Sequence, residues 1–381
     1  MNATRFVRVS RAVMLVVLLV AVGLASVAAT AVQEQETGVD STAAFRDMTD
    51  MRGRVVSVPT QIDAIVALGA NSLRLLTYFD SVAKVVAVED TGHAREKSVH
   101  DFFYLATYRI AHPELRELPS IGSEENHEAI IAADPDIVFS STVDVAALDQ
   151  LQSTLGIPVF AIDADVEIGN TDRFLEQFRL VGDLLGEAQR AAELITGVEE
   201  ILADLDARAA RVSEPKRAYA GGMMFYGPAD LLRTTGDYAP FDFTNTENVM
   251  PTNPVGNQQP YVTSLEELVR ADPDYVFIDA ANIALSLKGY RSNEELLDEQ
   301  VTAFENRDVY TTLVYKYYGT NWENQIINIY YAGTVLYPEV FSDVSAVAKA
   351  EEIWRLFFQV PLSYDEVVEL QAPGMGRADW W

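Results

Sequence analysis

The sequence predicts an α/β protein of two similar lobes with mainly parallel sheets, joined by one long rigid helix. Two segments on either side of the chain's centre read alike: residues 128–139 are EAIIAADPDIVF and residues 266–277 are EELVRADPDYVF. Between them, residues 187–211 carry apolar side chains at intervals of three and four, which is the spacing of one helical face. At 381 residues, the chain is also long enough for two domains.

Each copy of the repeat reads as a helix followed by a buried strand. The helical spacing stops at an Asp-Pro pair, because proline lacks an N–H group and disfavours helix in the residue before it. A short run of β-branched and aromatic residues follows, as expected of a parallel strand. All these features recur at one offset, so we interpret the repeat as a duplication. Two such lobes leave a cleft between them, where small ligands usually bind.

The central helix is predicted to connect the lobes. Gly182 and Gly186 offer a break, and the following stretch of about 25 residues would be roughly 37 Å long as a helix. The alternatives are an ordinary surface helix of one domain or a coiled-coil arm. The flanking repeat favours the connecting role. The predicted lobes are residues 45–170 and 212–370, with the helical spine at 171–211 and a tail at 371–381.

Residues 1–31 are predicted to be a signal peptide or a retained N-terminal anchor. Arg5, Arg8 and Arg11 precede an uncharged, mostly apolar stretch that ends in small residues. About 20 apolar residues could equally span a bilayer, so cleavage is left open. A disordered linker is expected at 32–44. The chain has no cysteine, which excludes a lipid-modified cysteine, disulfides and thiolate metal sites.

The composition predicts a folded protein that lives in high salt. The net charge is −29, only six residues are lysine, and 49% of residues are hydrophobic. Molar salt shortens the Debye length to about 3 Å, so an acidic surface repels itself little there. The alternative is an acidic secreted protein without salt adaptation. Nucleic acid is excluded as a partner by the charge.

The first lobe begins with a predicted hairpin at 51–59 and a crossover unit. A strand at 62–68 ends at Gly69, a helix at 70–78 starts with Asn71 or Ser72 as its cap, and a strand follows at 84–88. The helix N-terminus then lies at the carboxyl end of a strand, where α/β proteins receive ligands. Near the other end of the chain, helices at 326–337 and 344–358 are predicted to pack against the second lobe.

Several segments together resemble a known family. They are RVVSVPTQIDAIVALGANSLRLLTYFDSVAKVVAVED, AHPELRELPSIGSEENHEAIIAADPDIVF, RTTGDYAPFDF, SLEELVRADPDYVF and TNWENQIINIYYAGTVLYPEVF. They resemble the solute-binding proteins of ABC importers for iron chelates and cobalamin, over about residues 50–365. The resemblance implies two lobes on a single rigid helix, small lobe movement, and delivery of the ligand to a membrane permease with its ATPase. It also implies that Glu128 and Glu266 dock against permease arginines.

Tyrosine and arginine gather in three predicted loop regions, at 100–109, 223–238 and 315–322. Aromatic rings give rigid apolar contact, and arginine holds carboxylate or oxyanion oxygens in two-pronged geometry. Each tyrosine alone is equally consistent with core packing. The predicted ligand-binding residues are Ser72, Arg74, Tyr104, Tyr108, Arg109, Tyr226, Arg233, Thr234, Tyr238, Tyr318, Asn321 and Trp322.

The predicted function is an extracytoplasmic receptor that binds an iron chelate or similar anionic metal complex in the cleft. A molybdate or tungstate receptor of the same fold is the first alternative, and a secreted sensor or adhesion domain without a transport role is the second. No enzymatic motif is present. No histidine pair has helical metal spacing, so neither a metal site nor a cofactor is predicted. The protein is expected to be a monomer.

Overall fold

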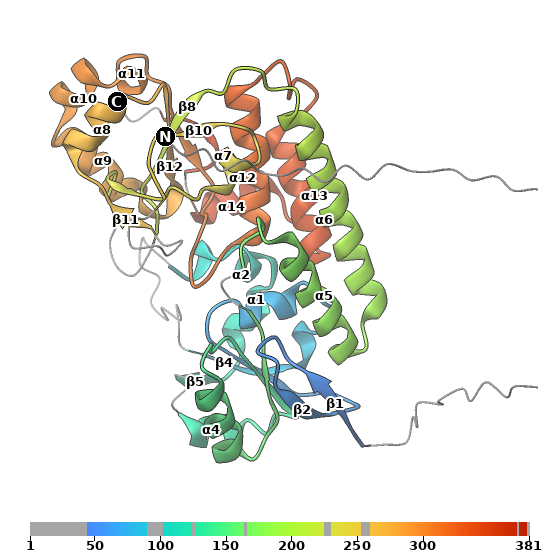
Figure 1. Cartoon of the computed structure of the whole chain (residues 1–381). Coiled ribbons are helices and arrows are strands. Elements are labelled where there is room, and N and C mark those ends of the chain that lie inside the picture. The colour runs from blue at the N-terminus through green and yellow to red at the C-terminus, as the bar shows by residue number, and fades with distance from the viewer. Residues whose placement is uncertain are drawn as a thin grey trace, which may run out of the picture. The chain divides into compact units, whose positions relative to one another are not determined.

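The computed structural model describes residues 44–89, 102–122, 126–163, 166–224, 230–252, 260–371 and 373–378. Within this part of the chain there are two α/β lobes, with an N-terminal lobe in blue and green and a C-terminal lobe in yellow and orange (Figure 1). The predicted signal segment, and the predicted linker up to residue 43, lie outside the described residues.

The N-terminal lobe contains a parallel sheet of five strands in the order β5-β4-β3-β6-β7. The strands are β3 (Ile65–Leu68), β4 (Val85–Glu89), β5 (Ser120–Gly122), β6 (Ile137–Ser140) and β7 (Val159–Ala161). Its helices are α1 (Ser72–Thr77), α2 (Tyr108–Ala111), α3 (His127–Ala132) and α4 (Val145–Leu155). The predicted hairpin forms as β1 (Phe45–Thr49) and β2 (Val55–Pro59), which pair antiparallel.

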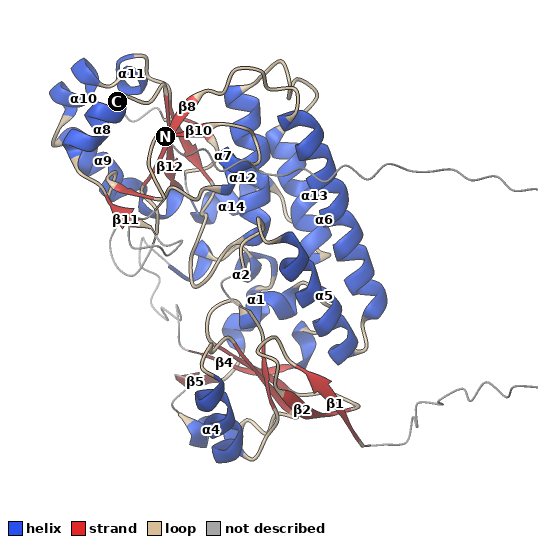
Figure 2. Ribbon diagram, in the orientation of Figure 1, coloured by secondary structure: helices blue, strands red, loops and turns tan. Residues whose placement is uncertain are grey.

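The C-terminal lobe contains a second five-stranded sheet in the order β10-β8-β12-β13-β14. Its strands β8, β10 and β12 are labelled in Figure 2. Four strands are parallel: β8 (Arg217–Gly221), β10 (Glu247–Asn248), β12 (Tyr275–Asp279) and β13 (Val309–Thr312). The fifth, β14 (Gly376–Arg377), falls in the predicted tail and adds an antiparallel edge. A small antiparallel pair is formed by β9 (Arg233–Thr234) and β11 (Tyr261–Val262). Helices of this lobe are α7 (Ala239–Asp242), α8 (Leu265–Ala271), α9 (Ile283–Arg291), α10 (Glu294–Gln300) and α11 (Thr302–Glu305).

The two lobes repeat the unit that the sequence predicts. Helix α3 leads into β6 as α8 leads into β12, and both Asp-Pro pairs start with an aspartate in the left-handed region, Asp134 at φ 50° and Asp272 at φ 41°. Val138 of β6 and Val276 of β12 each pair with a strand on both sides. The equivalent strands therefore occupy equivalent places in their sheets.

The spine consists of α5 (Thr171–Leu185) and α6 (Ala188–Ala209), which pack against each other (Figure 1). Gly186 breaks them with a φ of 75°, as predicted. The prediction that Gly182 also breaks the helix is wrong. Gly182 lies inside α5, and a Cβ there would meet the Cβ of Ala191 at 2.4 Å, so its role is to let α6 approach closely.

The last three helices contact both lobes. They are α12 (Trp322–Leu336), α13 (Ala346–Phe358) and α14 (Tyr364–Gln371). The ring centres of Phe357 in α13 and Tyr78, which follows α1, lie 4.8 Å apart. Gln371 of α14 donates to the backbone oxygen of Tyr104 at 2.8 Å. The helices predicted at 326–337 and 344–358 form, and α13 also contacts the first lobe. One cluster of buried apolar side chains includes residues of both lobes.

Candidate functional site

The loop after β13 leaves the C-terminal lobe and contacts the N-terminal lobe. We call residues 313–321 the strap. Tyr318 donates its hydroxyl to Glu89 Oε2 at 2.8 Å, and Glu89 is the last residue of β4. Glu89 also accepts the N–H of Gly69, which directly follows β3, at 2.7 Å. Because these groups follow the carboxyl ends of parallel strands, the carboxyl edges of the two sheets face each other. Ligands of α/β proteins bind at such edges.

Close approach between the strap and α1 depends on a glycine. Gly319 has a φ of 91°, which side chains rarely adopt, and a Cβ there would lie 2.3 Å from Asn71 Oδ1. Its neighbour Tyr318 also has a positive φ, 45°. Strained backbone of this kind persists only where surrounding contacts hold it.

Arg74 lies under the strap with none of its surface exposed. Its guanidinium donates to the backbone oxygens of Thr320 and Tyr317 and to Asn71 Oδ1, the last two at 3.2 and 2.8 Å. The group also lies 5.2 Å from the centre of the Tyr108 ring. The structure therefore shows Arg74 joining the lobes, and its contact with a ligand stays a prediction.

A buried carboxyl in the first turn of α12 extends this contact. Tyr78 donates its hydroxyl to Glu323 Oε2 at 2.5 Å, and both side chains are fully buried. Burial raises the pKa of Glu323, although Arg74 nearby acts in the opposite direction. Burial and the adjacent Glu323 raise the pKa of Tyr78. The pair is a polar contact between lobes that excludes water.

The predicted residues Asn321 and Trp322 are also buried between the lobes. Asn321 donates to the backbone oxygens of Leu105 and Val314, at 3.1 and 2.9 Å. The indole N–H of Trp322 donates to the backbone oxygen of Val166 at 2.9 Å. Both side chains have an exposed fraction of 0%. Their partners show packing and connection between the lobes, and their contact with a ligand stays a prediction.

The predicted cluster in the first lobe faces inward. Tyr108 accepts the Nε–H of Arg109 at 2.9 Å, and the two residues are 1% and 4% exposed. Tyr104 is partly exposed and accepts from Arg116 at 3.0 Å. Ser72 is buried and donates to the backbone oxygen of Leu68 at 2.6 Å. Of these four, only Tyr104 reaches the surface.

The predicted cluster in the second lobe is divided among different environments. Arg233 and Thr234 form β9, where Arg233 is partly exposed and Thr234 is buried. Tyr238 packs 4.9 Å from the ring of Tyr315, and burial raises its pKa. Tyr226 lies outside the described residues. Among the described residues, Arg233, Thr234 and Tyr238 are thus not brought together in one exposed site.

The base of the strap is fixed by a buried aspartate. Asp279, the last residue of β12, accepts the N–H groups of Ala281 and Tyr315 at 2.8 and 2.9 Å. Burial raises its pKa to about 7, while these hydrogen bonds act in the opposite direction.

Sequence reasoning missed one partly exposed ion pair between the lobes. Lys316 Nζ of the strap lies 2.6 Å from Glu167 Oε1, and Gln325 donates to Glu167 Oε2 at 3.1 Å. The side chains of Lys316 and Glu167 are 18% and 23% exposed. A signal was available, because Lys316 lies inside the predicted cluster at 315–322 and lysine is rare in this chain.

A family model described as "Periplasmic binding protein" matches residues 65–313, well over half of the chain. The chain belongs to this family. The molybdate-binding protein MolA of Haemophilus influenzae is 21% identical over 359 residues, covering 85% of this chain and 94% of MolA. A solved structure of MolA bound to molybdate has a TM-score of 0.66 at 20% identity, covering 84% of this chain and 99% of that one.

Two further solved structures share the fold. A periplasmic solute-binding protein from Veillonella parvula has a TM-score of 0.66 at 17% identity, covering 86% of this chain and 97% of that one. The periplasmic heme-binding protein HutB of Vibrio cholerae has a TM-score of 0.52 at 18% identity, covering 72% and 99%. The two-lobe fold predicted from sequence is confirmed as that of a periplasmic binding protein.

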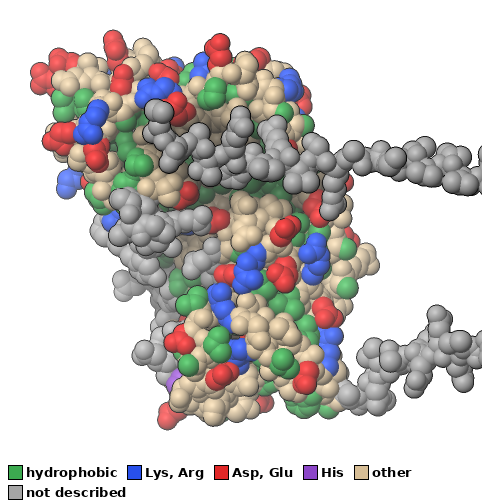
Figure 3. Space-filling view, viewed as in Figure 1, with side chains coloured by type: hydrophobic (Ala, Val, Ile, Leu, Met, Phe, Trp, Pro, Cys, Tyr) green, Lys and Arg blue, Asp and Glu red, His purple; other side chains and the backbone are tan. Residues whose placement is uncertain are grey.

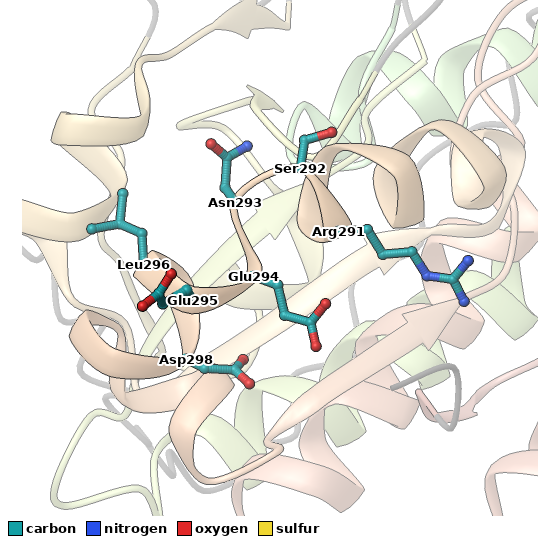
Figure 4. Close-up of a pocket in the computed structure, with 7 residues that line it drawn as sticks. All are labelled: Arg291, Ser292, Asn293, Glu294, Glu295, Leu296 and Asp298. Carbon is teal, nitrogen blue, oxygen red and sulfur yellow. The ribbon is translucent and has the colours of Figure 1, made fainter.

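A hollow of about 640 Å³ lies elsewhere in this periplasmic binding protein, at the junction of α9 and α10 (Figure 4). Its lining residues are Arg291, Ser292, Asn293, Glu294, Glu295, Leu296 and Asp298. None is a predicted ligand-binding residue. Figure 4 shows their charged groups pointing in different directions, not toward one point. The hollow therefore lacks the converging polar groups of a ligand site.

Charge and histidine complete the description of the surface. On the face viewed in Figure 3, acidic side chains are spread over both lobes and do not form a single patch. Among the described residues, no group of three or more His, Cys, Asp or Glu could hold a metal ion. His112 Nδ1 lies 3.1 Å from Glu114 Oε1, whereas His93 and His100 fall outside the described residues.

In the described part of the chain, no helix is long and apolar enough to cross a membrane.

Proposed function

We propose that this periplasmic binding protein is the extracytoplasmic receptor of an ABC importer. It would capture an iron chelate or similar anionic metal complex between the lobes and deliver it to a permease and its ATPase. The observation that carries the proposal is the meeting of the two carboxyl sheet edges at the strap. Strap residues 316–319 are partly exposed there, while the residues on either side are buried. A ligand at this position would touch both lobes.

Buried contacts between the lobes support a receptor that moves little when it binds. Besides Arg74, Arg190 of α6 donates to the backbone oxygens of Tyr78 and Phe357 at 2.8 and 2.9 Å. Separating the lobes would exchange these hydrogen bonds for bonds to water, and one hydrogen bond to a charged group contributes about 1.5–3 kcal/mol to stability. Small adjustments around a preformed site are therefore favoured over wide opening.

A molybdate or tungstate receptor is the second candidate. One observation favours it, namely the similarity to MolA over most of both chains. A bare oxyanion would need several donors converging on one small ion. Because Arg74 and Arg109 are buried and occupied by protein groups, this candidate has less support from the described side chains than a larger complex.

Glu128 and Glu266 are proposed as the permease-docking residues. Each is exposed in the first turn of an equivalent helix, α3 or α8. Asn126 caps α3, and a capping box of Ser264 and Glu267 begins α8. The helices thus present one carboxylate from each lobe on rigid supports.

Replacing both glutamates by arginine tests the docking role. We expect Glu128→Arg with Glu266→Arg to abolish ligand uptake by cells while the dissociation constant of the isolated protein stays unchanged. The matched control is Glu199→Arg with Glu200→Arg, which changes two exposed glutamates of α6. Loss of ligand affinity in the first variant, or equal loss of uptake in the control, would contradict docking by these residues.

The location and state of the protein follow from the same proposal. It would be a monomer outside the cytoplasm, either secreted or anchored to the outer face of the membrane by residues 1–31. The net charge of −29 supports a saline habitat. Unfolding midpoints measured from low to molar salt would test this, since a salt-adapted protein gains stability over that range.

A thermal-shift screen in molar salt tests the ligand class. The panel contains ferric siderophores, heme, cobalamin, molybdate and tungstate. A ligand at about 100 times its dissociation constant adds roughly 2.7 kcal/mol and raises the midpoint by a few degrees. Stabilisation by a metal chelate supports the first candidate, and stabilisation by molybdate or tungstate alone supports the second. If no compound stabilises the protein, a sensor or adhesion role without transport is favoured.

A further inference from the structure

The ion pair of Lys316 and Glu167 differs from the other contacts between the lobes. Arg74, Glu323 and Trp322 are fully buried, whereas roughly a fifth of each side chain in the pair is exposed. Glu167 follows β7 and Lys316 follows β13, and these strands occupy equivalent places next to β6 and β12. The pair therefore lies where the carboxyl edges of both sheets meet.

The geometry of Glu167 leaves Lys316 open to a competing anion. Gln325 donates to one carboxylate oxygen of Glu167, and the Lys316 ammonium meets the other. Gln325 is fully buried and holds Glu167 in place from within α12. An ammonium group has three rotatable donors, so it can contact a second anionic oxygen on its exposed side.

The arginines predicted to bind an anion are not placed to do so. Arg74 is occupied by the strap and Arg109 by Tyr108. An ammonium that is 18% exposed and comes from the strap itself is better placed than either. An anionic oxygen arriving there meets attraction from Lys316 and repulsion from Glu167.

We propose that Lys316 contacts an anionic oxygen of the bound metal complex and that Glu167 competes with this oxygen for the ammonium. The inference rests on the proposed receptor function and adds a ligand class to it. The ligand carries acidic oxygens at its edge, as in a tris-catecholate complex or the propionates of heme. Glu167 keeps Lys316 oriented in the ligand-free protein. By competing for the ammonium, Glu167 also lowers the affinity of the protein for weakly charged molecules.

Two substitutions at the pair distinguish ligand contact from a structural role. Lys316→Met and Glu167→Gln each break the same ion pair, so a purely structural pair predicts changes in affinity of the same sign. Ligand contact predicts opposite signs. Lys316→Met should weaken binding at least about tenfold, the value of one charge-assisted hydrogen bond. Glu167→Gln should strengthen it about threefold, because a repelling charge is removed.

The measurement is the dissociation constant of the full chain by fluorescence titration at one fixed salt concentration. The probes are ferric enterobactin and hemin as anionic complexes, molybdate as a bare oxyanion, and ferrichrome as a neutral chelate. Lys349→Met and Glu352→Gln are the matched controls, because they break a similar ion pair within α13, at 2.8 Å. They should leave every dissociation constant unchanged.

The outcomes separate failure of this inference from failure of the proposed function. Opposite changes for an anionic probe, with the controls unchanged, support ligand contact by Lys316. Changes of equal sign, no change at all, or binding of ferrichrome alone would overturn the inference while keeping the receptor function. If the wild-type chain binds none of the four probes, the metal-complex receptor function itself is overturned, and the inference with it.

Discussion

Neighbouring residues of the strap make opposite kinds of contact with their surroundings. Tyr315 donates its N–H to Asp279, which is buried and has a pKa raised to about 7. Lys316, the next residue, reaches a partly exposed carboxylate of the other lobe. Burial makes the first contact important for stability, and exposure makes the second available for binding. Two neighbouring residues of one loop thus differ in whether solvent can reach their polar contact, and only the contact of Lys316 is open to the ligand role proposed above.

Removing the buried arginine should have the largest effect on stability. Arg74→Met leaves the backbone oxygens of Thr320 and Tyr317 without their donor. We expect the free energy of unfolding to fall by about 2–6 kcal/mol, because each buried acceptor left unpaired costs about 1–3 kcal/mol. Urea unfolding measures it, with Arg211→Met at an exposed position as the control. A loss equal to that of the control would show that the buried contact does not hold the strap.

The buried aspartate should make stability depend on pH. The folded pKa of Asp279 is about 7, above the ordinary value, so the folded state keeps the proton longer. The contribution of Asp279 to the free energy of unfolding is therefore fully present at low pH and is lost as the pH rises toward 7. A difference of about three pKa units corresponds to about 4 kcal/mol. Urea unfolding of wild type and Asp279→Asn from pH 4 to 7 should show a shallower decline in the variant. If stability declines equally with pH in wild type and variant, Asp279 does not cause the pH dependence.

Closing the gap at Gly319 should have an intermediate effect. Gly319→Ala adds a methyl group at a φ of 91° and 2.3 Å from Asn71 Oδ1. We expect a loss of about 2–3 kcal/mol from backbone strain and overlap together. Gly53→Ala is the matched control, because Gly53 has a φ of 78° with no atom within 4 Å of the added Cβ. Gly53→Ala should lose about 1–2 kcal/mol, the cost of a left-handed conformation for a residue with a Cβ. Equal thermal midpoints for the two variants would argue against close packing of the strap on α1.

The exposed pair should contribute least to stability. Glu167→Gln breaks an ion pair whose side chains are partly in water, so the expected loss is less than about 1 kcal/mol. The same substitution is nevertheless expected to strengthen ligand binding about threefold. A loss as large as that of Arg74→Met in urea unfolding would place the pair with the buried contacts, and the contrast within the strap would disappear.

Much of the fold could be predicted because it depends on short-range patterns. The Asp-Pro pairs end α3 and α8, and β-branched runs form β6 and β12. Gly186 ends α5 because it adopts a left-handed conformation without strain. Gly182 was misread for a related reason. Glycine also permits close helix packing, and a sequence does not distinguish that use from a break.

The binding residues were harder to predict because burial depends on segments far apart in the chain. The contact of Arg74 with Thr320 spans 246 residues, and that of Lys316 with Glu167 spans 149. Nothing local to Arg74 shows that a loop of the other lobe covers it. The resemblance to a family implies a ligand between the lobes, but it does not indicate which cations remain accessible to solvent there.

The sequence by itself determined the two α/β lobes, their duplication and the helical spine, since helix and strand periodicity and proline breaks are properties of neighbouring residues. Only the tertiary structure decided which polar groups join the lobes and which reach the solvent. The outcome depends on how the strap crosses onto α1, because a cation that the strap covers is held by protein groups, whereas one at its edge stays accessible to solvent.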